Sequence, residues 1–228
     1  MLDISHIPYQ QQSTFIFYAT GNFQTWSKPR NAKFIEIFCL GAGGGGSHTT
    51  VTATSVAGGG GGASGGIVRG LIPAFLLPDI LYILVGKGGI GPSTSNTAGG
   101  SGGISYVSLQ PSTSEQTLIC KSSTTAAGGA TAAGNAATAP TISVVALSAF
   151  GNLGLFTAIA GVAGVAGGAS TGANGNSQNA LGSNLIVGGA GGGGKTASVR
   201  GNGGFINAAT SELTAKYGVT SVPTVLLV

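Results

Sequence analysis

Residues 37–47 read IFCLGAGGGGS, and this step from an apolar run into a glycine tract is the pattern that decides the fold. Similar glycine tracts recur in VAGGGGGASGG at 56–66 and in LIVGGAGGGGK at 185–195. Glycine loses more conformational freedom on folding than any other residue, and it supplies no side chain to a core. Whole tracts of glycine are therefore expected where backbones approach one another closely, which indicates architecture rather than catalysis.

Composition supports a folded chain. Glycine accounts for 44 of the 228 residues, more than twice the usual share of about 7%. Glycine-rich linkers and disordered segments are normally polar or charged, whereas here hydrophobic residues make up 42% and charged residues only 6%. Enough Phe, Ile, Leu and Val is present, in short packets between the glycines, to build a core.

The apolar packets are short and rich in β-branched and aromatic residues, which predicts strands. We expect a mainly β fold, in which short strands and glycine-rich extended (polyglycine II-like) segments pack as a sandwich with little or no α-helix. Residues 14–40 are expected to form a hairpin, or two adjacent strands joined by a longer loop at 21–32. Further strands are predicted at 67–85 (strand, loop, strand), 104–110, 115–121 and 222–228.

The stretch 141–169 carries no charged residue, and its glycines Gly161, Gly164 and Gly167 recur every third position. A period of three fits an extended left-handed helix of the polyproline II type, which has no internal hydrogen bonds and must therefore bond sideways to its neighbours. Poor helix propensity and the lack of a basic flank favour such a packed segment. A membrane span over 141–169 is the alternative.

Three regions are predicted along the chain: an N-terminal docking segment at 1–13, a glycine-rich β domain at 14–140, and a second glycine-rich part of the same or a closely packed domain at 141–228. The echo of IFCLGAGGGG in LIVGGAGGGG indicates a layered, repeated architecture. The opening MLDISHIPYQQQ lacks the basic and apolar pattern of a signal peptide. We therefore expect synthesis in a cytoplasm without general secretory export.

One motif imitates a nucleotide site. Residues 189–196 read GAGGGGKT, which satisfies the phosphate-loop pattern with Lys195 and Thr196. However, the following segment 197–208 is broken by glycines and does not predict the helix that the motif requires. The tract at 41–48 has the same glycines without Lys-Thr. Nucleotide binding is therefore kept only as an unfavoured alternative.

No other catalytic or binding chemistry is indicated. No pair of carboxylates is placed for acid–base work, and neither His6 nor His48 has a partner at metal-ligand spacing. The sequence nominates no catalytic residue, cofactor or metal, and we expect a protein that is not an enzyme.

Charge and cysteine content add two expectations. The net charge of +4 is spread thinly, and a cluster of three basic residues beside one turn does not form the patch of a nucleic-acid binder. No nucleic-acid partner is therefore expected. Cys39 and Cys120 each end an apolar run, which is typical of buried free thiols, although spacing alone leaves a disulfide open.

The stretch TGNFQTWSKPRNAKFIEIFCLGAGGGGS at 20–47 resembles the opening of the glycine-rich domain found in bacteriophage tail-fibre and related virion proteins. The resemblance continues through ILVGKGGIG (83–91), GGSGGISYV (99–107) and LICKSSTTAAGGA (118–130). Trp26 is expected to be a packing anchor at a turn. The other residues assigned a structural role are Pro29, Gly43, Gly44, Gly161, Gly164 and Gly167.

This resemblance implies a non-enzymatic structural or adhesive role on a virus particle. Some phage adhesins of this character pack glycine helices into a sandwich and display variable loops toward the host surface. No long N-terminal shaft precedes the motif, which shifts the expectation from a tail-fibre tip toward a capsid decoration or head-fibre subunit. The expected location is the virion. The expected partners are further copies of the chain (a trimer as the simplest guess), other virion proteins, and a host surface glycan or protein.

If the role is adhesive, contact should come from polar loops between the glycine segments. Two loops qualify, STSNT at 93–97 and TGANGNSQN at 171–179. Ordinary solvated turns are the alternative for both. The candidate receptor-contact residues are Ser93, Thr94, Ser95, Asn96, Thr97, Asn174, Asn176 and Gln178.

Overall fold

The computed structural model describes residues 13–48, 57–94, 96–122, 125–129, 155–168, 178–180, 206–208 and 225–227. Over these residues the chain forms short strands and one turn of 3-10 helix, η2 (Ala74–Leu76). The strands are β1 (Phe15–Phe17), β2 (Gln24–Ser27), β3 (Phe34–Leu40), β4 (Ile67–Pro73), β5 (Ile80–Leu84), β6 (Tyr106–Ser108), β7 (Leu118–Lys121), β8 (Leu155–Ile159), β9 (Gln178–Ala180), β10 (Ile206–Ala208) and β11 (Val225–Leu227).

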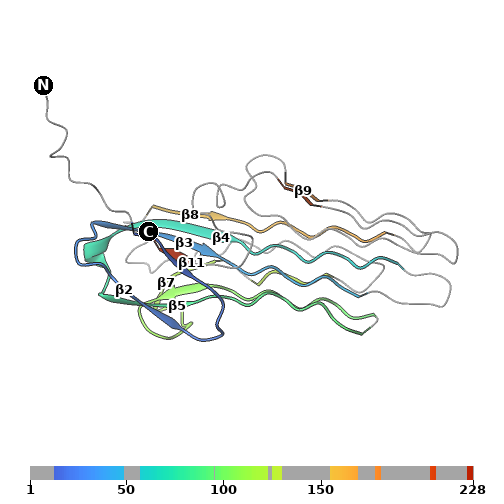
Figure 1. Ribbon diagram of the computed structural model, residues 1–228, viewed down its shortest axis with the longest axis horizontal. Coiled ribbons are helices and arrows are strands. Elements are labelled where there is room, and N and C mark those ends of the chain that lie inside the picture. The colour runs from blue at the N-terminus through green and yellow to red at the C-terminus, as the bar shows by residue number, and fades with distance from the viewer. Residues whose placement is uncertain are drawn as a thin grey trace, which may run out of the picture.

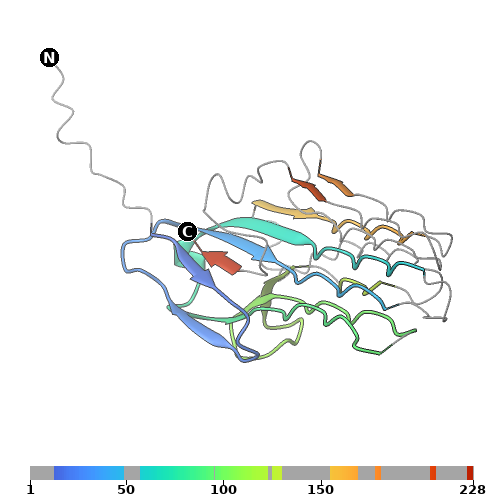
Figure 2. The same cartoon turned by 45° about the vertical axis from the view of Figure 1, so that its right-hand side comes forward.

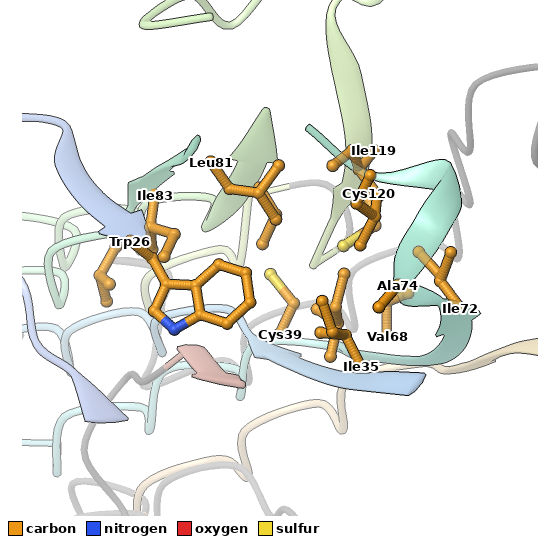
Figure 3. Packing of buried hydrophobic residues seen from close by; sticks show 14 residues of the cluster. Trp26, Ile35, Cys39, Val68, Ile72, Ala74, Leu81, Ile83, Ile119 and Cys120 are labelled. Carbon is orange, nitrogen blue, oxygen red and sulfur yellow. The ribbon is translucent and has the colours of Figure 1, made fainter. Parts of the chain in front are cut away.

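Two antiparallel sheets face each other as a sandwich (Figure 1). One has the strand order β1-β11-β3-β4-β8 and the other the order β2-β5-β6-β7, while β9 and β10 form a separate parallel pair. One hydrophobic cluster draws on both sheets (Figure 3). Its buried members are Trp26, Ile35, Ile37, Cys39, Val68, Ile72, Ala74, Leu77, Leu81, Ile83, Val85, Val107, Ile119 and Cys120.

Strand alternation separates the two faces of the larger sheet. Ile35 lies opposite Ile72 in register, and both side chains enter the core. Glu36, one position further along, lies outside the core and forms an ion pair with Arg69 of β4. The charge of Glu36 inside β3 is therefore accommodated because side chains of a strand point alternately to opposite faces.

Beyond the side-chain core, the strands continue as extended glycine segments. β3 runs into 41–47, and β4 emerges from 57–66; β5 and β6 are joined in the same way through 86–103. Figures 1 and 2 show these segments as wavy rods that lie side by side and project from one end of the sandwich.

The rods are joined by backbone hydrogen bonds that repeat every third residue. The N–H groups of Gly41, Gly44 and Ser47 donate to the carbonyls of Gly66, Ala63 and Gly60 at 2.9, 2.8 and 2.9 Å, within the layer that continues the larger sheet. The next residues along, Ala42, Gly45 and His48, donate to Gly103, Gly100 and Thr97 at 3.0, 2.9 and 3.0 Å, across to the rod that continues the smaller sheet.

This pattern differs from a β-sandwich, in which hydrogen bonds run only within each sheet and the sheets lie about 10 Å apart. In the rods, hydrogen bonds also run between the layers, as expected for helices with three residues per turn and no internal bonds. At the positions that face a neighbouring rod, the short distance between the backbones leaves no room for a side chain. A Cβ on Gly62 would lie 2.1 Å from the carbonyl oxygen of Gly44, and one on Gly99 would lie 2.0 Å from that of Gly45.

The period-three prediction for Gly161, Gly164 and Gly167 is confirmed. The N–H groups of Gly58, Gly61 and Ser64 donate to the carbonyls of Gly168, Val165 and Val162, again at a spacing of three. A Cβ on Gly164 or Gly167 would lie 2.0 or 2.1 Å from a carbonyl oxygen of the facing rod, and Gly161 is buried. Of the earlier tract, a Cβ on Gly44 would lie 2.1 Å from Ala127 O, whereas one on Gly43 would meet Ala63 O at 3.3 Å.

The mainly β, sandwich-like fold with extended glycine segments is thus confirmed. Strand, loop and strand are found within 67–85, and β11 lies within 222–228. The expected hairpin at 14–40 is wrong: β1 and β3 belong to one sheet, but β11 lies between them. The expected loop at 21–32 contains β2, which pairs with β5 in the other sheet.

The apolar stretch 141–169 is described from residue 155 onward. There it forms β8 and an extended glycine rod, which shows that this half is not helical. Across the described part of the chain, no helix has the length and apolar character needed to cross a membrane.

Candidate functional site at the ends of the glycine arms

From β3 to β7, consecutive strands are joined alternately by glycine arms at one end of the sandwich and by short connections at the other. We call 41–48 together with 57–66 the first arm, and 86–94 together with 96–103 the second arm. The opposite end, which carries the connections 74–79 and 109–117, is called the base. The arms project from the sandwich in the direction away from the base (Figure 1).

The two arms are joined by a backbone bridge between His48 and Thr97. The His48 N–H donates to the Thr97 carbonyl at 3.0 Å, and the Thr97 N–H donates back to the His48 carbonyl at 2.9 Å. The hydroxyls of Thr94 and Thr97 are hydrogen-bonded at 2.8 Å. The second arm therefore ends in a turn that is tied both to itself and to the first arm.

Local sequence explains this turn. Asn96 has φ 55°, in the left-handed region that asparagine tolerates better than most residues. Pro92 fixes the backbone on the other side of the turn. Ser93, Thr94 and Asn96 are exposed, and Thr97 is half-buried. These hydroxyl and amide groups form an uncharged polar surface, with the 80% exposed Ile90 close by in sequence. Ser95 lies outside the described residues.

Of the second predicted loop, 171–179, the structure describes only residues 178 and 179. Asn174 and Asn176 lie outside the described residues, as does the phosphate-loop-like stretch 189–196. The backbone of Gln178 begins β9 and pairs in register with Ile206 of β10.

Between core and arms lies a small polar network that sequence reasoning missed. We call this region the neck and define it by Leu40, Gly86, Ser105 and Ser122. The Ser105 hydroxyl donates to the Leu40 carbonyl at 2.7 Å and accepts from the Gly86 N–H at 3.0 Å. The Ser105 N–H donates to the Ser122 hydroxyl at 3.0 Å, and both serines are buried. The signal in the sequence is a lone serine between a glycine tract and a strand.

Trp26 packs in the core as expected, but it lies in strand β2 rather than at a turn. Its side chain is 5% exposed, and its ring makes an edge contact with Phe15 at a centroid distance of 6.0 Å. Nε1 has no hydrogen-bond partner among the described residues. Pro29 begins a tight turn in which its carbonyl accepts from the Ala32 N–H at 3.1 Å.

Lys28, immediately before this turn, has a structural role. Lys28 Nζ donates to the carbonyls of Ala74 and Leu77, at either end of the 3-10 turn, and forms an ion pair with Asp79 at 3.4 Å. A lysine side chain that spans a base connection in this way is not available to bind phosphate.

Other candidate chemistry is limited. A shallow hollow of about 320 Å³ on the outer face of the larger sheet is lined by Glu36, Arg69, Gly70, Leu71 and Thr157, and its two charged groups pair with each other. Within the described ranges, no group of three or more His, Cys, Asp or Glu side chains is gathered as a metal site would require.

Comparison with known families agrees with the architecture. No curated protein is detectably similar to the chain in sequence. A family model described as a glycine-rich domain matches residues 18–221, which include the arms and every described strand except β1 and β11. The chain therefore belongs to the glycine-rich domain family.

Proposed function

We propose that this chain is a non-enzymatic structural protein on the surface of a virus particle, where it serves attachment or decoration. On this proposal the base docks to the particle, and the ends of the glycine arms face outward, toward a host glycan or protein. The observation that carries it is the tip: the polar turn 93–97 is held by the His48–Thr97 bridge at the end of the arms.

The arms suit such a role because their rigidity does not depend on side chains. Each rod is bonded to its neighbours through main-chain groups, so the tip turns can vary in sequence without disturbing a packed core. A turn of hydroxyl and amide groups fits hydrogen bonding to sugars or to polar protein loops. The resemblance of 20–47 to phage tail-fibre glycine-rich domains supports the viral setting.

The base offers a surface for assembly. Phe75 is 82% exposed in the 3-10 turn, and Phe34 is 61% exposed at the start of β3, opposite Pro73 in register. Large exposed aromatic side chains are a liability in a free monomer. We therefore propose that they contact further copies of the chain, in a homo-oligomer such as a trimer, or another virion protein.

The proposal is tested by mass spectrometry of purified particles and by a cell-binding assay. We expect the protein in the particles at a defined copy number. The tip variant S93A/T94A/N96G removes the exposed polar groups, and glycine at 96 tolerates the left-handed backbone. It should reduce host-cell binding at least tenfold. The matched variant Q110A/T113A, which changes exposed polar residues of a base connection, should leave the binding of the purified protein to host cells unchanged, because on this proposal the base contacts the particle and not the host.

Absence of the protein from purified particles would overturn the viral assignment. Presence in particles combined with equal binding by the tip and base variants would retain the structural role and reject the adhesive one.

A further inference from the structure

Cys39 and Cys120 lie in different sheets but in one cluster. Cys39 is close to the end of β3, and Cys120 belongs to β7. Both side chains are fully buried in the core, and both are free thiols. Figure 3 shows the two sulfur atoms on the inner side of their strands, in the space between the sheets. Cys39 Sγ donates to the Ser105 carbonyl at 3.4 Å.

The sandwich narrows at this position. One residue after Cys39, the Leu40 carbonyl accepts a hydrogen bond from Ser105, which comes from the other layer. Two residues later the Ala42 N–H donates directly to the Gly103 carbonyl across the layers at 3.0 Å. The layers therefore close from the usual separation of about 10 Å to direct backbone contact. A disulfide joins Cα atoms about 4.4–6.8 Å apart. This separation is smaller than the usual distance between two sheets and larger than that of layers in direct backbone contact.

We propose that Cys39 and Cys120 are a site of oxidation, at which the folded protein forms a disulfide across the neck when it meets a small-molecule disulfide. One thiolate attacks the oxidant and forms a mixed disulfide with release of one thiol. The second cysteine then attacks the mixed disulfide and releases the other thiol. The protein loses two protons and two electrons, and the small disulfide is reduced to two thiols.

The environment sets the rate of this reaction. Burial raises the pKa of the Cys39 thiol well above its ordinary value, and the adjoining Cys120 thiol adds to the shift. Since only the thiolate attacks, oxidation near neutral pH should be slow, should accelerate as the pH rises, and should require transient opening of the core.

The bond would fasten the two sheets where the arms leave the core. The cysteines are far apart in the chain, with both arms between them. A crosslink over such a long segment restricts the unfolded chain strongly, and this is how disulfides are thought to stabilise proteins. The inference does not rest on the proposed viral role.

The test is prolonged equilibration of the folded full chain, without denaturant, in mixtures of reduced and oxidised glutathione at pH 8. Under oxidising mixtures both thiols should disappear together. A peptide pair linking the Cys39 and Cys120 segments should be recovered, and Tm should rise by roughly 5–10 °C. Addition of dithiothreitol should reverse all three changes.

Matched variants separate the bond from other effects of oxidation. The Tm of C39S and the Tm of C120S should not rise in the oxidising mixture. The Tm of C39S/C120S should be the same in the oxidising and the reducing mixtures. Free thiols that persist at the most oxidising ratio, or glutathione adducts and intermolecular dimers in place of the internal pair, would overturn the proposal.

Discussion

The hydroxyl of Ser105 donates a hydrogen bond of 2.7 Å to the carbonyl oxygen of Leu40 and thereby joins the two layers at the neck. On the side toward the base, side chains fill the space between the sheets. On the side toward the arms, backbone N–H and carbonyl groups of the two layers are hydrogen-bonded to each other directly. A serine fits this boundary because its hydroxyl is small and can both donate and accept.

The first prediction concerns this serine. Ser105→Ala leaves the Leu40 carbonyl and the Gly86 N–H without this buried partner, and a buried group that loses its partner costs about 1–3 kcal/mol. We expect the free energy of unfolding in urea to fall by about 2–4 kcal/mol. Ser114→Ala, in an exposed base connection, should change it by less than about 0.5 kcal/mol. Equal effects of the two variants would show that the neck network contributes nothing specific.

The second prediction compares two glycines. A Cβ on Gly62 would lie 2.1 Å from the carbonyl oxygen of Gly44, which is backbone and cannot rotate away. Gly62→Ala should therefore separate two rods and cost about 3 kcal/mol or more, as severe overpacking does. A Cβ on Gly88 would meet no atom within 4 Å beyond its chain neighbours, and Gly88 has no positive φ. Gly88→Ala should be neutral or stabilise by up to about 1 kcal/mol, because alanine restricts the unfolded chain.

Thermal unfolding of both variants checks this prediction. If Gly62→Ala unfolds at the same temperature as the parent protein, the close approach of the rods is not required for stability.

Much of this architecture could be predicted from local sequence. β3, β4, β5 and β6 each border a glycine tract, and Gly161, Gly164 and Gly167 carry the three-residue period that the hydrogen bonds follow. These features are local, since the residues that form a rod are adjacent in the chain. The polar turn at 93–97 is predictable for the same reason.

Pairing between distant segments could not be predicted in this way. β11 lies between β1 and β3, although it is the last described strand. The sequence of a short apolar run does not determine which other strands it pairs with. The flanking Gly21 and Pro29 predict a turn around Trp26, yet its register with Leu81 makes it part of a strand. The bridge between the two arms likewise depends on segments that lie side by side, which neither segment specifies alone.

The third prediction concerns alkaline pH. The pKa of Cys39 is raised in the folded state, chiefly by burial, so the unfolded chain releases this proton at a lower pH than the folded one. Stability is therefore full below the ordinary thiol pKa of 9.0 and falls as the pH rises above it. One thiol contributes a slope of about 1.4 kcal/mol per pH unit. The pKa of Tyr106 is also raised, by burial and by Cys39. Ionisation of Tyr106 in the unfolded chain therefore adds to the loss of stability above the ordinary tyrosine pKa of 10.0.

Urea unfolding between pH 8 and pH 10 under reducing conditions measures this slope. Cys39→Ala should lower stability at pH 8 and flatten the decline above pH 9, whereas Tyr106→Phe should change the profile only at the alkaline end. A decline of the same slope in Cys39→Ala would assign the effect to other groups.

The fourth prediction separates two roles of Lys28 at the base. Its ammonium group donates to the carbonyls of Ala74 and Leu77, and it also pairs with Asp79, whose side chain is 94% exposed. An ion pair with so exposed a partner contributes little, whereas hydrogen bonds from a charged donor contribute about 1.5–3 kcal/mol. Lys28→Met, which keeps the aliphatic stem, should therefore lower the free energy of unfolding by about 2 kcal/mol. Asp79→Asn should lower it by less than about 0.5 kcal/mol, and the exposed Lys33→Met serves as the control for loss of charge. If Asp79→Asn were as damaging as Lys28→Met in urea unfolding, the ion pair rather than the carbonyl contacts would hold the 3-10 turn in place.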